Sequence, residues 1–245
     1  MSALLRAELL KLRTTRTFAA LVAAALALSL LVVVLTTLID DGLAEEDVRN
    51  LFSADFSSLF ILLLGVMGMA GEWRHRTITS TILAAPDRLR LLGAKTLSYA
   101  VAGVVLSLIV TVTIMAVGTL ILSSRGETTV GIGDLADVLW RNLTVAALLG
   151  ALGVCIGGLV RNQVVAIIGL LVFSFALEPA IFGLAPEVGR FGPTSGAPNG
   201  ILGIEGFDGG VEELLAPGIA VVVMIAWVAG CFAAAGALLQ RRDLT

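Results

Sequence analysis

Residues 18–39 read FAALVAAALALSLLVVVLTTLI, a run of 22 residues without one charged side chain. A helix of about 20 apolar residues crosses the roughly 30 Å hydrocarbon core of a bilayer. Basic residues precede the run, but it is longer than the apolar core of a signal peptide and no small-residue cleavage pattern follows it. We therefore expect residues 18–39 to be a retained membrane span.

The rest of the chain has the same character. Of the 245 residues, 58% are apolar and only 14% are charged, whereas about 25% of the residues of a soluble domain are charged. Five further segments are candidate spans: 56–71, 97–122, 138–160, 164–184 and 216–239. The sequence thus predicts an all-α membrane protein with six transmembrane helices in a single domain, 1–245. Span 56–71 is short, and we expect span 164–184 to break at Pro179.

Basic residues gather on one side of this topology. The side that holds both termini carries 12 of the 16 lysines and arginines: Arg6, Lys11, Arg13, Arg16, Arg74, Arg76, Arg88, Arg90, Lys95, Arg161, Arg241 and Arg242. Because cytoplasmic loops of membrane proteins are rich in lysine and arginine, we expect both termini to be cytoplasmic. With acidic residues included, this side carries +8 and the other side −11, which together give the net charge of −3.

Composition also excludes several classes of site. One histidine, His75, and two cysteines, Cys155 and Cys231, are too few for a His/Cys zinc site in one chain, and both cysteines are expected to pack in apolar surroundings. The chain has no G-x-x-x-x-G-K-[ST] phosphate-binding loop. We therefore predict no catalytic residue, metal or cofactor in this chain, and no nucleic-acid partner.

Two segments on the basic side carry an apolar face outside the predicted spans. Residues 2–16 predict a short helix with Leu5, Leu9 and Leu12 on one side, a pattern that suits the inner membrane interface, with Arg13 among the basic residues off that side. Residues 72–95 consist of two short segments joined at Ala85-Pro86-Asp87, where proline disfavours helix and Asp87 can cap the segment that follows.

The chain resembles the membrane subunits of the ABC-2 permease family. The resemblance lies in the basic helix before the first span, in six spans with both ends inside, and in the stretch EWRHRTITSTILAAPDRLRLLGAK at residues 72–95. In the family, this stretch shows a glutamate, a Gly/Thr-Thr-Ile/Leu core, a proline and basic residues. Here His75-Arg76-Thr77-Ile78 replaces the usual core, which is a modest departure.

The resemblance implies a division of labour between chains. Two permease subunits pair, here as an expected homodimer, and each docks a separate ATP-binding cassette subunit that binds ATP and magnesium. The segment that would dock in the ATPase is a coupling helix, to which we assign Glu72, Trp73, Arg74, His75, Arg76, Thr77, Ile78, Ile82 and Leu83. The helix 2–16 would be an interfacial elbow in contact with membrane lipid. The family also implies a location in the bacterial plasma membrane.

On this basis we expect the chain to be the permease of an ATP-driven exporter for an apolar or amphipathic substrate. Displacement of the loop 72–95 would move the second and third spans as a lever does. The glycines of residues 65–71 and 153–157 would provide close-packed faces along which the helices can slide. A non-transporting scaffold or sensor, an ion-coupled carrier and an intramembrane enzyme remain alternatives. A scaffold or sensor, or an ion-coupled carrier, would have a helical fold similar to that of a permease.

Charged residues within the predicted spans are rare, so Glu178 stands out. It is either a water-exposed residue at a kink made by Pro179, or a gate or pathway residue that faces a central cavity. The Gly/Pro-rich segment 183–213 follows it. That segment is either an irregular surface loop or a cap that dips into the membrane over the pathway.

Overall fold

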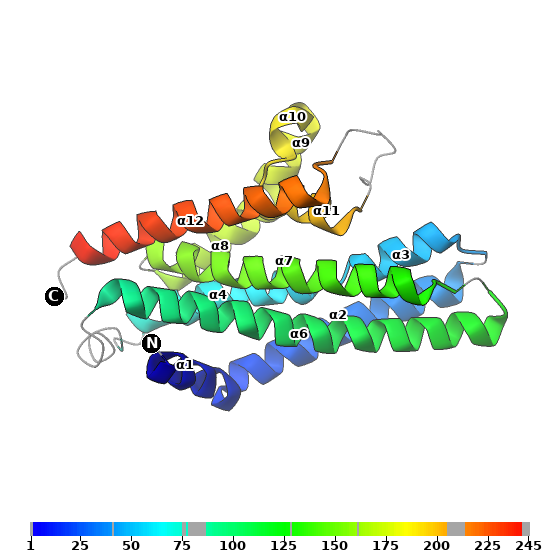
Figure 1. Cartoon of the computed structure of the whole chain (residues 1–245), viewed down its shortest axis with the longest axis horizontal. Coiled ribbons are helices and arrows are strands. Elements are labelled where there is room, and N and C mark those ends of the chain that lie inside the picture. The colour runs from blue at the N-terminus through cyan, green and yellow to red at the C-terminus, as the bar shows by residue number, and fades with distance from the viewer. Residues whose placement is uncertain are drawn as a thin grey trace.

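The computed structural model describes residues 2–40, 42–74, 77, 87–127, 129–160, 162–204 and 214–241, and these residues form helices without any strand. Figure 1 shows the arrangement. The helices are α1 (Ser2–Thr14), α2 (Arg16–Ile39), α3 (Glu45–Ser53), α4 (Ser57–Arg74), α6 (Arg88–Arg125), α7 (Ile132–Leu159), α8 (Gln163–Val172), α9 (Glu178–Leu184), α10 (Pro186–Gly189), α11 (Gly196–Leu202) and α12 (Pro217–Arg241), with a π-helical turn, η1 (Phe173–Leu177), between α8 and α9.

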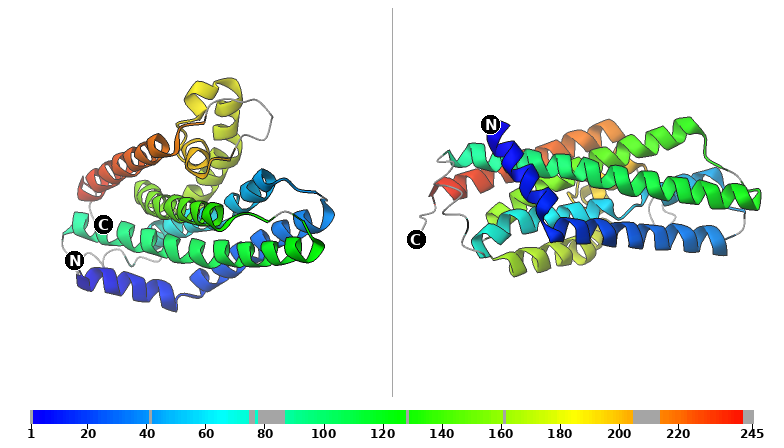
Figure 2. Two further views of the ribbon diagram at one scale, coloured as in Figure 1. Left: turned by 45° about the vertical axis from the view of Figure 1, so that its right-hand side comes forward. Right: turned by 90° about the horizontal axis from the view of Figure 1, so that it is seen from below.

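In the part of the chain that the structure describes, six helical segments are long and apolar enough to cross a membrane, and they correspond one by one to the six predicted spans. The all-α membrane class is therefore confirmed. The second span is longer than predicted, because α3 precedes α4 and only residues 54–56 interrupt the helix. Both chain termini lie at the same end of the bundle, which we call the termini end (Figures 1 and 2).

Helix α6 is the longest element. Its 38 residues extend about 57 Å at 1.5 Å per residue, far beyond the thickness of the hydrocarbon core. The helix begins where the sequence predicts a cap, because a carboxylate oxygen of Asp87 accepts a hydrogen bond from the Arg90 amide at 3.1 Å. It ends at Gly126, whose φ of 72° is the left-handed conformation that commonly terminates helices.

Helices α4, α6 and α7 form the centre of the bundle, and glycine lets their backbones touch. A Cβ atom at Gly153 of α7 would lie 2.3 Å from the carbonyl oxygen of Leu62 on α4. A Cβ atom at Gly103 of α6 would lie 2.3 Å from the carbonyl oxygen of Ala146 on α7. These distances are shorter than any real Cβ contact, so the three helices pack as closely as they do only because these side chains are absent.

The fifth span does not break at Pro179 as the sequence suggested. Helix α8 continues through the π turn into α9, and the Glu178 amide donates to the Phe173 carbonyl, five residues back. Proline clashes with the carbonyl four residues before it, and widening one turn relieves this clash without ending the helix. The outer part of this span stands away from the central helices (Figure 2).

The Gly/Pro-rich segment is ordered over the residues that the structure describes, up to residue 204. It holds the short helices α10 and α11, and α11 packs between α7 and α12 with Ala197 and Ile201 fully buried. An irregular surface loop is therefore the wrong description of this part. Its placement relative to the membrane stays a prediction.

The close packing gives the first testable prediction. The change Gly153→Ala should destabilise the protein by about 1–3 kcal/mol, because the new methyl group cannot fit beside the Leu62 carbonyl. The matched control is Gly169→Ala in α8, where nothing lies within 4 Å of the new Cβ and where alanine favours helix by up to about 1 kcal/mol. Thermal unfolding in detergent measures both. Equal shifts for the two variants would contradict the packing described above.

Candidate functional site

Helix α1 turns one face toward the bundle. Leu12 is buried and Leu5 and Leu9 are half-buried, whereas Arg13 is exposed. This is the orientation that the leucine spacing predicts. The same face carries Glu8, which is only 5% exposed although it belongs to an otherwise basic helix. Figure 2 shows α1 lying obliquely across the termini end of the bundle.

Glu8 is part of a buried cluster of four charges at the termini end, formed with Lys11, Glu72 and Lys95. The Lys95 ammonium, with its side chain 1% exposed, lies 2.8 Å from Glu8 Oε2 and 2.8 Å from Glu72 Oε1. It also donates to the Gly68 carbonyl at 3.3 Å. Lys95 thereby joins α1, α4 and α6 at one point.

Lys11 completes the four-charge cluster from the solvent side. Its ammonium lies 3.0 Å from Glu72 Oε1 and 3.5 Å from Glu8 Oε1, and its side chain is 54% exposed. The cluster is thus electrically neutral, with two carboxylates and two ammonium groups. Neutrality matters here because an unpaired charge in the interior is far more costly than a paired one.

The position of the cluster relates it to the predicted coupling loop. Glu72 lies two residues before the end of α4, and Lys95 lies in the first turns of α6. Residues 75–86 connect these two helices. The Glu72–Lys95 ion pair therefore ties the two ends of the loop to each other, and Glu8 ties both to α1.

The predicted coupling residues divide into three groups. Glu72 is 5% exposed and faces the four-charge cluster, so its side chain is not on the surface. Trp73 is half-buried, whereas Arg74 and Thr77 are exposed, and the Thr77 amide donates to the Glu72 carbonyl at 3.0 Å. The other five, His75, Arg76, Ile78, Ile82 and Leu83, lie outside the described residues.

Glu178 is buried, with 2% of its surface exposed, so the water-exposed alternative is wrong. Its Oε1 accepts hydrogen bonds from the amides of Ser195 at 2.8 Å and Gly196 at 3.0 Å, and its Oε2 accepts from the amide of Thr194 at 3.1 Å and from the Thr194 hydroxyl. The carboxylate therefore caps the N-terminus of α11 from a distant part of the chain.

Space for this cap depends on a glycine. A Cβ atom at Gly192 would lie 2.0 Å from Glu178 Oε1, so any other residue there would displace the carboxylate. Pro179, the other predicted gate residue, is exposed. The geometry gives Glu178 a structural role in attaching α10 and α11 to the fifth span, and a pathway role stays a prediction for both residues.

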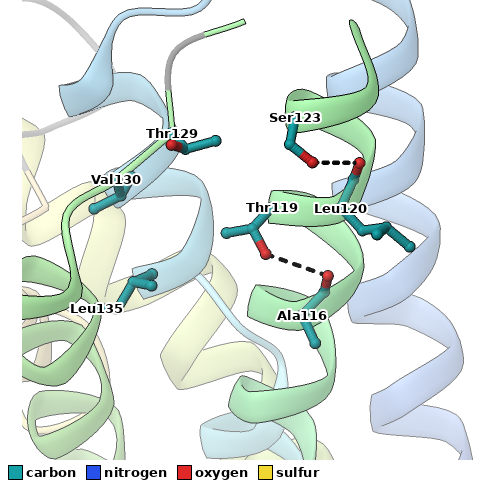
Figure 3. Close-up of a pocket in the computed structure, with 7 residues that line it drawn as sticks. All are labelled: Ala116, Thr119, Leu120, Ser123, Thr129, Val130 and Leu135. Carbon is teal, nitrogen blue, oxygen red and sulfur yellow. Dashed lines mark hydrogen bonds between the residues drawn. The ribbon is translucent and has the colours of Figure 1, made fainter. Parts of the chain in front are cut away.

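A groove of about 370 Å³ opens at the end of the bundle opposite the termini, between α6 and the segment that leads into α7. Figure 3 shows its lining: Ala116, Thr119, Leu120, Ser123, Thr129, Val130 and Leu135. The Thr119 and Ser123 hydroxyls donate to carbonyls of their own helix, at 3.2 Å to Ala116 and 3.0 Å to Leu120. None of these seven side chains is charged, so the lining offers hydroxyl groups and apolar surface but no ionisable side chain.

Reading the sequence alone missed the partners in the four-charge cluster. In the sequence pattern, Lys11 and Lys95 are only two of the basic residues that flank the spans. The signal that could have revealed the cluster is Glu8, which shares a helical face with Leu5 and Leu12 at spacings of three and four residues. A carboxylate on an apolar face needs a buried cation, and Lys95 is a candidate because it lies at the start of a span.

The cluster predicts an asymmetric response to mutation. Lys95→Met should destabilise the protein by about 3–5 kcal/mol, because it removes the buried cation and leaves the carboxylates of Glu8 and Glu72 with only the exposed Lys11. Arg90→Met, on the same helix, should cost under about 1 kcal/mol, because Arg90 is 73% exposed and its one ion pair among the described residues is with Asp87. Chemical unfolding of both variants in mixed micelles measures this difference, and a mild effect of Lys95→Met would contradict it.

Comparison with known proteins agrees with this architecture. A family model described as "ABC-2 family transporter protein" matches residues 4–177, which include α1, the four-charge cluster and the first five helices long enough to span a membrane, apart from the last turns of the fifth. A search of curated proteins finds no match to the chain. Because the family model covers well over half of the 245 residues, the chain belongs to the ABC-2 family of transporter proteins.

Proposed function

We propose that this multi-pass membrane protein is the permease subunit of an ATP-driven exporter, and that it works as a homodimer with two copies of a separate ATP-binding cassette subunit. Family membership supports an ABC-type permease that associates with an ATPase. The proposal adds the direction of transport, the number of subunits and a bacterial plasma membrane with both termini in the cytoplasm. The basic side of the sequence supports that orientation.

The observation that carries the proposal is the junction of three helices at the four-charge cluster. Any force that an ATPase applies to residues 75–86 reaches α4 through Glu72 and α6 through Lys95, and the ion pair between them resists separation of the two helices. Glu8 adds α1 to the same junction. Movement of the ATPase is therefore passed to a group of helices rather than to one.

The close packing of α4, α6 and α7 extends this group. Because backbone atoms touch at Gly103 and Gly153, α7 follows the two helices that hold the loop. The remaining long helices are more exposed: α2 and α12 both carry apolar side chains such as Leu38, Val222 and Ile225 on their surfaces. In the proposed mechanism, the central helices move as one body against these outer helices and against the second subunit.

An apolar or amphipathic substrate fits the charges that the structure describes. Within the spans, the buried carboxylate of Glu178 is already used by backbone amides. The exposed helix surfaces are apolar, which suits entry from the inner leaflet. The ATP and magnesium would be held by the partner subunit, and no residue of this chain is assigned to them.

The proposal predicts that binding and coupling can be separated. Arg74→Glu, on the exposed side of the loop, should weaken co-purification with the ATPase subunit. Glu8→Gln should leave the complex intact but lower the transport per ATP hydrolysed about tenfold. The variant loses the Glu8–Lys95 ion pair and with it part of the coupling between the loop and the helices, and a coupling free energy of 1–3 kcal/mol corresponds to a factor of about 5–150. Both are measured in proteoliposomes that contain the co-expressed complex.

The matched control is Glu46→Gln, which changes an exposed carboxylate in the first turn of α3 at the other end of the bundle. It should affect neither binding nor transport. The proposal fails if no ATPase co-purifies with the chain, or if the complex hydrolyses ATP without moving any apolar or amphipathic compound. The coupling role of the cluster fails if Glu8→Gln and Glu46→Gln behave alike.

A further inference from the structure

Two arginines, Arg49 of α3 and Arg141 of α7, form a pair in the half of the bundle away from the termini, where α3 and α11 both contact α7 (Figure 1). Both approach the same carboxylate oxygen, Oδ2 of Asp137, at 3.8 and 2.8 Å. Asp137 also accepts a hydrogen bond from Trp140 Nε1 at 2.8 Å. Among the described residues, no other carboxylate pairs with either arginine. The arginine pair therefore keeps one positive charge in excess.

Many hydrogen-bond donors of the arginine pair are not used by the protein. Arg141, whose side chain is 15% exposed, donates to the Ile201 carbonyl of α11 at 3.2 Å. Arg49, whose side chain is 35% exposed, makes no hydrogen bond within the described residues, because 3.8 Å from Asp137 is too long for one. A guanidinium group carries five N–H donors. Those of Arg49 are left for water or for a ligand.

The two guanidinium groups face the same spot beside Gly203, the residue that caps the end of α11. A Cβ atom at Gly203 would lie 2.8 Å from Arg141 Nη1 and 3.7 Å from Arg49 Nη2. The φ of 70° explains why glycine stands here, and its missing side chain leaves the two cations facing open space. Because like charges repel, a second anion at this spot would stabilise the pair.

The arginine pair lies at the level of a membrane boundary. Helix α7 ends at Leu159 near the termini end, and about 20 residues of helix cross the hydrocarbon core. Counting back from Leu159 places the opposite boundary next to Trp140, which is 44% exposed. Tryptophan is enriched at the level of the lipid headgroups, and the Arg141 guanidinium lies 5.8 Å from the centre of the Trp140 ring. The anions present at this level of a bilayer are lipid phosphates.

We propose that the arginine pair binds the phosphate group of one anionic phospholipid, in the leaflet opposite the termini. The planar guanidinium group presents paired donors that match phosphate oxygens. A phosphodiester carries a single negative charge, which neutralises the excess charge of the pair. The bound phosphate would connect α3 with α7 and with the end of α11. This site requires only that α7 crosses the bilayer, and it does not depend on the proposed transport activity.

The surroundings favour a particular kind of headgroup. Free phosphate has the same oxygens, but lipid phosphates are held at this level by the bilayer itself, next to the exposed apolar ring of Trp140. In a zwitterionic lipid, the ammonium group would be brought close to two guanidinium groups, which repel it. A headgroup without a cation, such as the glycerol of phosphatidylglycerol, avoids this repulsion.

The test is the thermal stability of the full chain in a non-ionic detergent with one of three additions. These are phosphatidylglycerol, diacylglycerol with the same acyl chains, and inorganic phosphate. We expect phosphatidylglycerol to raise the Tm by about 3–6 °C, the shift for a ligand present at about ten times its Kd. Diacylglycerol lacks the phosphate and inorganic phosphate lacks the lipid, so each should change the Tm by less than about 1 °C.

Variants locate the effect, because the basic residues of α1 also attract anionic lipid. Arg49→Gln should lose about half of the phosphatidylglycerol shift or more. The matched control Arg125→Gln should keep the shift, since Arg125 already pairs with Glu127 at 3.2 Å. Asp137→Asn removes the carboxylate that competes with the phosphate, and it should enlarge the shift.

Three results would overturn the proposal. Equal shifts for Arg49→Gln, Arg125→Gln and the wild type would assign the lipid to other basic residues. A full shift with diacylglycerol would show that the phosphate is irrelevant, and a full shift with inorganic phosphate would show that the site takes a free ion. Because these measurements need no ATPase subunit, failure of the proposed transport function would leave their outcome unchanged.

Discussion

Contact between backbones at the centre of the helical bundle is the constraint on which the rest of this structure depends. Helices in lipid gain little from burying apolar side chains, because the lipid is equally apolar, so close van der Waals packing must hold them together. In this chain, Gly103 and Gly153 supply that packing by letting α6 meet α7 and α7 meet α4 without intervening side chains. A bundle held in this way is stiff at its centre and has little freedom for one central helix to slide past another.

This stiffness changes how motion can pass through the molecule. From the sequence, we expected the loop 72–95 to lever the second and third spans, with the glycine faces as sliding surfaces. The packed centre instead favours rigid movement of α4, α6 and α7 together. At the termini end, the Glu72–Lys95 ion pair also favours joint movement, because it resists separation of α4 and α6 where the loop joins them.

Much of the fold could be predicted because the length and apolar composition of a segment are enough to identify a membrane span. The six spans and the cap at Asp87 needed only local information. The four-charge cluster was missed because it pairs residues that are 87 positions apart, and basic residues near spans are normally interpreted through topology. The burial of Glu178 was not predicted for a similar reason, since its partners lie 16 to 18 residues further along the chain and are mostly backbone amides.

Pro179 illustrates a different limit of prediction from the sequence. Proline usually ends or kinks a helix, and the sequence has no feature that distinguishes a break from a π turn. The π turn keeps Glu178, which directly follows residues 173–177, within the helix, and from there its carboxylate caps the N-terminus of α11. A break at this point would free Glu178 from its place in the helix and leave the α11 amides without a cap.

The two ends of the bundle solve the problem of buried charge differently. At the termini end, two carboxylates and two ammonium groups from α1, α4 and α6 neutralise one another within the chain. At the α3–α4 interruption, Asp55 is surrounded only by neutral donors. The first cluster thus balances its charge through ion pairs between helices, whereas the second leaves its carboxylate to hydrogen bonds from neutral groups of the described residues.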